Sequence, residues 1–201
     1  MGRSRLLILR HAERPPLVKG EGGAELSITG PGKAAAFALG RSFGSSLVSL
    51  RTSPVRRCKQ TSKSLLRGAD VELSIVCDRG LGDPGAFIAD PDLAWQNWSR
   101  LQQDGVLAHL ASLAGPLPGF TATVPAAFGL IGDLLVSTGG RAGVHVAVTH
   151  DALMIPLLVA LRGRPLERGL WPDYLEWIEL WQEERQLCFR WRGEEGRGSL
   201  D

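Results

Sequence analysis

The sequence lacks several features that would place it in a specialised class of protein. No apolar stretch in its 201 residues is long enough to span a bilayer, and its start has no hydrophobic region of the signal-peptide type. The formal net charge is only +2, which is too small to indicate binding to nucleic acid. We therefore expect a protein that has neither a membrane nor a nucleic acid as its partner.

Cysteine is also scarce. Cys58, Cys77 and Cys188 are odd in number and do not have the spacing of metal ligands, so the sequence indicates neither a disulfide framework nor a zinc site. We expect all three to be reduced, as in a cytoplasmic protein. Cys77 and Cys188 are expected to serve as small apolar side chains on strands.

The composition and patterning indicate one α/β domain that covers residues 1–201. Hydrophobic and charged residues make up 44% and 22% of the chain, as in an ordinary globular protein. We predict strands at 5–9, 47–50, 71–76, 143–149, 174–181 and 186–191, and helices at 31–43, 55–66, 93–113, 124–137 and 152–161. This alternation predicts a three-layer α/β/α sandwich with a mostly parallel central sheet and an antiparallel pair at one edge.

We make a separate structural prediction for each of three further segments. The residues after the first strand, up to Gly23, form a loop rich in glycine and proline. The alanine-rich helix at 31–43 is expected to lie close against the sheet through its alanines. Glycine, proline, aspartate and aromatic residues dominate from about 80 to 120, which predicts an insertion over the sheet and not a separate domain.

Polar residues follow three of the predicted strands. Arg10-His11 follows the first strand, Ser53 to Arg57 the second, and His150-Asp151 the strand at 143–149. Parallel sheets place their ligand sites at the carboxyl ends of the strands, so these residues are expected to share one pocket. Arginine forks match phosphate oxygens and would repel a metal cation, while an imidazole beside a bound phosphoryl group can attack the phosphorus.

Four segments together resemble the histidine phosphatase superfamily, which is also called phosphoglycerate mutase-like. Arg10-His11-Ala12 is similar to the Arg-His-Gly signature of that family, and Val148-Thr149-His150 to the segment with its second histidine. Leu26 to Ala34 and Ser53 to Thr61 resemble the Leu-Thr-x-x-Gly-x-x-Gln-Ala and Ser-Pro-Leu-x-Arg-Ala-x-Gln-Thr segments of the family. The four segments stand in family order over about three quarters of the chain.

The resemblance implies a role for each matching residue. His11 is the expected nucleophile, which becomes transiently phosphorylated. Arg10, Arg57 and His150 are expected to bind the phosphoryl oxygens and to stabilise the charge of the transition state. No metal or organic cofactor is implied. The expected ligand is a small phosphorylated substrate, and phosphate or sulfate is expected to occupy the same pocket.

The resemblance leaves the proton donor open. Arg10 to Pro16 resembles the Arg-His-Gly-x-Arg-x-Pro form of the acid phosphatase branch, which makes Arg14 a further phosphate ligand and favours Asp151, in the pair His150-Asp151, as the acid. In the other branch the donor lies in the inserted segment, where Asp83 is the candidate. Glu13 is a third candidate, although we expect it to orient the neighbouring arginines.

Three features of the chain depart from patterns within the family. Ala12 replaces the family's glycine, which puts a methyl group where the backbone approaches phosphate. At 201 residues the chain is also much shorter than acid phosphatases of the second branch and lacks most of their helical cap. The pattern of the glycolytic mutases is absent after His11.

The function predicted from the sequence is hydrolysis of a phosphomonoester through a phosphohistidine on His11. The alternatives are a phosphohistidine protein phosphatase in signalling and a non-catalytic protein that binds phosphate esters. Phe87, Trp95 and Trp98 are expected either to form an apolar wall for the leaving group or to anchor the insertion on the sheet. Trp171 to Tyr174 is a further candidate border of the pocket. The substrate and the oligomeric state are not predicted.

Overall fold

A computed structural model describes residues 2–16, 23–184 and 186–198 of the chain. Most of the loop that was expected up to Gly23 lies outside the described residues. The strands are β1 (Ser4–Arg10), β2 (Leu47–Thr52), β3 (Ile75–Cys77), β4 (Gly143–Thr149), β5 (Trp177–Glu183), β6 (Gln186–Trp191) and β7 (Glu194–Gly198). The α-helices are α1 (Gly30–Phe43), α2 (Arg56–Ala69), α3 (Pro91–Leu110), α4 (Thr123–Ser137) and α5 (Asp151–Arg162). Short 3₁₀ helices span Gly44–Ser46, Arg79–Leu81 and Arg168–Leu170.

The strands form one seven-stranded sheet in the order β3-β2-β4-β1-β5-β6-β7. The first four strands in this order run parallel, and β5, β6 and β7 continue the sheet as antiparallel neighbours. The predicted α/β class and the antiparallel edge are confirmed. The edge has three strands where the sequence indicated two, because the glycine-rich and charged β7 lacks the apolar alternation of a half-buried strand.

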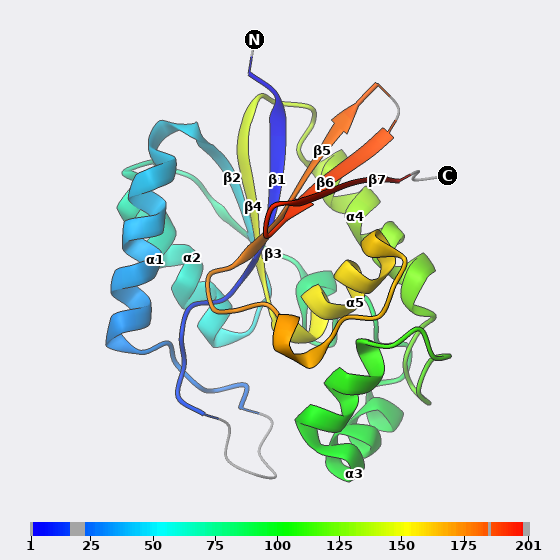
Figure 1. Cartoon of the computed structure of the whole chain (residues 1–201). Helices are drawn as coiled ribbons and strands as arrows, with labels where there is room; N and C mark the ends of the chain where they lie inside the picture. Colours follow the sequence, from blue (N-terminus) through cyan, green and yellow to red (C-terminus); the bar gives the residue numbers. More distant parts are fainter. Residues whose placement is uncertain (1, 17–22, 185, 199–201) are drawn as a thin grey trace.

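Helices cover both faces of the sheet (Figure 1). Successive side chains of a strand point to opposite faces, so Leu7 and Leu9 of β1 pack in the core on the side of α2, whereas Leu6 and Ile8 pack with α4 and α5 on the other side. Because both faces are buried, β1 and β4 are almost continuously apolar. This arrangement is the predicted three-layer sandwich.

Two local predictions were wrong. Of the four alanines in α1, only Ala36 is buried, and the helix packs closely against α2 through glycine. A Cβ on Gly40 would lie 2.1 Å from the carbonyl oxygen of Leu65 in α2, so only a glycine allows this approach. Cys77 is exposed at the end of the short strand β3 and is not a buried filler, while Cys188 is buried as expected.

The segment from Gly80 to Gly119 lies at the carboxyl ends of the parallel strands. Its helix α3 spans Pro91–Leu110, two to three residues earlier than predicted, and its backbone is non-helical at Gln102. Figure 1 shows α3 near the start of α5, at the end of the sheet opposite to the N-terminus. No helix in the described part of the chain is long and apolar enough to cross a membrane.

Candidate active site

The sheet topology brings the three polar strand ends together. β4 lies between β1 and β2, so His11, Ser53 and His150 follow the ends of three adjacent parallel strands. Backbone hydrogen bonds continue the pairing beyond the strands, from His11 N to Thr149 O and from Ser53 N to Val148 O, each at 2.9 Å. The rings of His11 and His150 are 5.4 Å apart between centroids.

His11 is held with one nitrogen available for chemistry. Its side chain is 1% exposed, and its Nδ1 lies 2.8 Å from the carbonyl oxygen of Ala12, to which it donates. Burial is the main cause that lowers the pKa of His11 to about 3, and the positive charges of Arg57, Arg10 and Arg14 lower it further, against the bond to Ala12, which raises it. At neutral pH the imidazole is therefore uncharged, with the lone pair on Nε2.

Arg57 links the two histidines. Its Nε donates to His11 Nε2 at 3.1 Å, and its Nη2 lies 3.1 Å from His150 Nδ1. Its Nη1 donates to the carbonyl oxygen of Gly23 at 2.8 Å, so the described end of the first loop also approaches this group. His150 is 6% exposed, and burial lowers its pKa well below the usual range, so it too is neutral and can donate to an oxyanion.

Arg10 and Arg14 differ in how their charges are matched. Arg10 forms an ion pair with Asp151 at 2.7 Å and donates to the carbonyl oxygen of Pro172 at 2.6 Å. Arg14 is 9% exposed and donates to the carbonyl oxygen of the neighbouring Pro15, while its buried Nε has no hydrogen-bond partner. Among the described residues, neither Arg14 nor Arg57 has a carboxylate within 4.0 Å, in contrast to Arg10. The site thus carries an excess of positive charge.

The two candidate acids lie in different surroundings. Both oxygens of Asp151 are engaged, one by Arg10 and the other by the backbone N–H of Ala152 at 2.8 Å. Asp83 is exposed and accepts no hydrogen bond from the described residues. It directly follows Gly82, where a Cβ would lie 2.9 Å from His150 Nε2. Glu13 accepts from the hydroxyl of Thr29 at 2.5 Å and pairs with no arginine in the described parts of the chain.

Several residues of the site were given no individual role by the sequence. Thr61 accepts the backbone N–H of Ala12 at 3.0 Å, and Ser53 Oγ lies 3.1 Å from His150 Nε2. Both belong to the segment that resembles the family, which is the signal that would have identified them. Cys58 Sγ lies 3.5 Å from His150 Nε2, and burial raises the pKa of this thiol to about 12, so it packs against the ring as a neutral group.

The methyl group of Ala12 lies in a small apolar cluster. Ala12 is fully buried, and its side chain packs with Ile28 and with Ala36 of α1. This contact anchors the first loop on α1.

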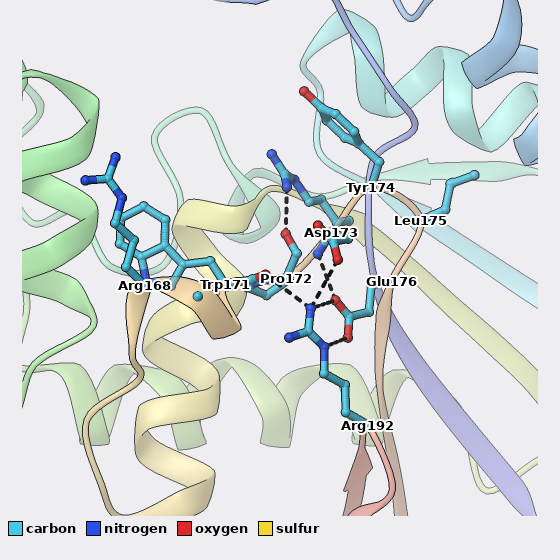
Figure 2. A pocket seen from close by; sticks show the side chains of 10 residues that line it. Arg168, Trp171, Pro172, Asp173, Tyr174, Leu175, Glu176 and Arg192 are labelled. Atoms are coloured by element: carbon cyan, nitrogen blue, oxygen red, sulfur yellow. Dashed lines mark hydrogen bonds and ion pairs between the residues drawn. The ribbon is translucent and has the colours of Figure 1, made fainter.

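Tyr174 reaches the site from a segment far along the chain. Its ring lies 5.7 Å from that of His11 between centroids, and the Arg10 guanidinium lies 4.2 Å from the centre of the Tyr174 ring. On the other side of the same segment, Arg192 pairs with Glu176 at 2.6 Å (Figure 2). A cavity of about 580 Å³ lies beside Arg10 here and is lined by residues 168–169, 171–176 and Arg192. The segment Trp171–Tyr174 does border the site.

Two further histidines lie outside this group. His145, in β4, makes hydrogen bonds to Ser49 Oγ and to the carbonyl oxygen of Arg141, and His109 bonds to the carbonyl oxygen of Gly115. Within the described residues, no group of three histidine, cysteine, aspartate or glutamate side chains could hold a metal ion.

Solved structures with the same architecture match nearly the whole chain. YhfR from Bacillus stearothermophilus superposes with a TM-score of 0.64 at 19% identity, over 95% of this chain and 97% of that one. A mutant phosphoserine phosphatase from Entamoeba histolytica, in complex with phosphoserine, gives a TM-score of 0.63 at 15% identity, over 98% and 95%. A mycobacterial glucosyl-3-phosphoglycerate phosphatase gives 0.59 at 22% identity, over 90% of each chain.

No protein-family model and no curated protein sequence matches the chain. At identities of 15% to 22%, the structural likeness establishes the fold and leaves the reaction to be argued from the site. The chain has the phosphoglycerate mutase-like fold of the histidine phosphatases.

Proposed function

We propose that the protein is a phosphatase that hydrolyses a small phosphomonoester through a phosphohistidine on His11. The observation that carries this proposal is the unmatched positive charge around a neutral, buried imidazole. Arg14 and Arg57 have no carboxylate partner among the described residues, and a buried charge without a counter-ion is costly. A phosphoryl dianion supplies the missing charge and accepts hydrogen bonds from both guanidinium groups.

We propose the following steps for the reaction. His11 Nε2 attacks phosphorus while the bond to the ester oxygen breaks, and the hydrogen bond from His11 Nδ1 to Ala12 fixes the ring and matches the positive charge that it gains. Arg57, Arg14 and His150 stabilise the equatorial oxygens. Water then attacks the phosphohistidine, the P–N bond breaks, and inorganic phosphate leaves.

We propose Asp83 as the acid that protonates the leaving oxygen and then accepts the proton of the attacking water. The sequence favoured Asp151, but both oxygens of Asp151 are already engaged by Arg10 and Ala152. Asp151 then acts as a positioning residue for Arg10. Asp83 follows Gly82, where a Cβ would lie 2.9 Å from His150 Nε2, and its carboxylate is exposed and accepts no hydrogen bond from the described residues.

The architecture and the neighbouring structures support the rest of the proposal. The chain is proposed to be a single domain in which residues 80–120 cover the site. The mycobacterial neighbour is described in complex with inorganic phosphate and the Entamoeba neighbour with phosphoserine, and both are named as phosphatases. We also propose that the protein is cytoplasmic, where its three free cysteines would stay reduced.

The test is hydrolysis of para-nitrophenyl phosphate with and without EDTA. We expect turnover that does not depend on a metal and that is abolished in His11→Ala. Quenching with alkaline detergent during turnover of a ³²P-labelled ester should trap a phosphoprotein that is stable to base and labile to acid in the wild type, and none in His11→Ala. Unchanged activity in that variant would overturn the mechanism.

A further inference from the structure

A second pocket, apolar in character, lies between the segment from Pro84 to Trp98 and the start of α5. Its volume is about 200 Å³, and the described residues that line it include no charged side chain. Phe87 and Phe120 are 3% and 7% exposed and form part of its buried wall. Nothing in the mechanism above uses this pocket.

The pocket adjoins the proposed reaction centre on two sides. Pro84 and Gly85, in its wall, directly follow Asp83, and Ala152 and Leu153 directly follow Asp151. A Cβ on Gly85 would lie 3.4 Å from Gly82 Cα and 3.5 Å from Leu153 Cδ1. A Cβ on Gly82 would in turn lie 2.9 Å from His150 Nε2, so the turn from Gly82 to Gly85 borders both the pocket and the proposed phosphate site.

The mouth of the pocket is aromatic. Trp95 lines it and is nevertheless 53% exposed, and Trp98 is half-buried beside it. Both tryptophans lie on α3, the helix at the carboxyl ends of the parallel strands (Figure 1). A large aromatic side chain left open to solvent next to an apolar hollow is typical of a binding surface.

We propose that this pocket binds the leaving group of the substrate and that the substrate is a phosphomonoester of an aromatic alcohol. This inference rests on the proposed function, because it gives the pocket the group that is attached to the phosphoryl oxygen. An apolar cavity of about 150 Å³ is sufficient to hold a benzene ring, so about 200 Å³ accommodates one aromatic ring with a short side chain.

The same lining disfavours charged leaving groups. An ammonium or carboxylate that entered the pocket would lose its hydration without meeting an opposite charge. Phosphoserine and phosphoglycerate carry such groups, so the pocket selects against them. We therefore expect this chain to differ in specificity from a phosphoserine phosphatase of the same fold.

The test compares esters whose leaving groups are all primary alcohols. We expect kcat/KM for 2-phenylethyl phosphate to exceed that for phosphoserine and ethanolamine phosphate on the order of tenfold to a hundredfold, the range that apolar pockets supply. Equal or lower kcat/KM for the aromatic ester, with all three esters hydrolysed, would overturn the pocket assignment and leave the proposed phosphatase function standing.

Variants of Trp95 test whether the preference for the aromatic ester arises from this pocket. Trp95 is exposed, so Trp95→Ala does not open the core, and it should reduce the preference for the aromatic ester about tenfold, whereas Trp95→Phe should retain most of it. Leu113→Ala is the matched control, because Leu113 is an exposed apolar residue of the same segment that does not line the pocket. An unchanged preference in Trp95→Ala would overturn the assignment.

A binding measurement separates the two proposals. Benzylphosphonate and methylphosphonate cannot be hydrolysed, and we expect the first to bind about tenfold more tightly, with the difference lost in Trp95→Ala. If this holds while no ester is hydrolysed, the pocket is supported and the phosphatase function fails. Equal affinity of the two phosphonates would overturn the pocket.

Discussion

The guanidinium of Arg57 donates a hydrogen bond to His11 Nε2 at 3.1 Å, the nitrogen that is proposed to attack phosphorus. A phosphoryl group that approaches His11 must therefore replace this bond with one from Arg57 to its own oxygen. The exchange moves Arg57 from the nucleophile to the substrate without moving its backbone. It couples binding of the phosphoryl group to release of the lone pair.

This coupling predicts a large effect of Arg57→Gln. We expect a loss of about 10²–10³-fold in kcat, as for removal of other transition-state donors, together with a higher KM. Arg56→Gln is the matched control, because the neighbouring Arg56 is exposed, and its activity should stay near that of the wild type. Steady-state kinetics with para-nitrophenyl phosphate measure both variants. Equal losses in the two variants would argue against a specific role of Arg57.

Because the charge of Arg14 is buried and has no carboxylate partner among the described residues, removing it should raise the stability of the free protein and weaken its binding of phosphate. Arg14→Met should raise the free energy of unfolding in phosphate-free buffer, on the order of 1 kcal/mol, because it removes a buried charge. The same variant should gain less stability from added phosphate than the wild type, since the stabilisation by a ligand rises with the logarithm of its affinity. Urea denaturation with and without phosphate measures both effects. Arg67→Met, on the exposed side of α2, should show neither.

The lowered pKa of His11 predicts how stability depends on pH. The pKa is about 3 in the folded protein and 6.5 in the unfolded chain, so between these values the unfolded chain binds a proton that the folded protein excludes. Stability should therefore fall as the pH drops from 6.5 toward 3, by about 1.4 kcal/mol per pH unit from His11. Urea denaturation of the wild type and His11→Gln between pH 7 and 5 measures this slope. The variant should have the shallower slope, and identical slopes would contradict the pKa.

The leaving group distinguishes the two candidate acids. Asp83→Asn should lose about 10²–10⁴-fold in kcat/KM on alkyl phosphates but much less on para-nitrophenyl phosphate, whose leaving group needs no protonation. Asp151→Asn should lower activity on both substrates alike, because it releases Arg10. If Asp151→Asn shows the dependence on the leaving group and Asp83→Asn does not, the acid is Asp151, as the sequence favoured.

A side chain at position 82 is expected to clash with His150. A side chain there would stand 2.8 Å from Ser53 Oγ and 2.9 Å from His150 Nε2, and the residue has a φ of +136°, which favours glycine. Gly82→Ala should displace His150 and reduce kcat, on the order of 10²-fold. Gly115→Ala lies in the same segment with open space around it and should leave kcat near the wild-type value. A fully active Gly82→Ala would show that His150 tolerates the shift.

The contrast between α1 and β1 shows which parts of the fold could be predicted. Apolar periodicity located β1, β4 and the edge strands, because burial of both sheet faces leaves a continuous apolar run. The alanines of α1 led to a wrong prediction of its contact, because alanine occurs at both buried and exposed positions. The sequence also does not show which element the helix packs against. The contact is made by Gly40, whose missing side chain admits the Leu65 carbonyl of α2.

The sequence by itself determined the class of the fold and indicated which polar residues follow the strands, since the carboxyl ends of parallel strands lie at one edge of a sheet. Only the tertiary structure decided how their charges are matched. Arg10 meets Asp151 from 141 positions away, whereas Arg14 and Arg57 meet no carboxylate among the described residues. Which side chains meet depends on distances in space, which the order of the residues along the chain does not specify. The position of Tyr174 beside His11 and the apolar pocket beside Gly85 depend on such distances too.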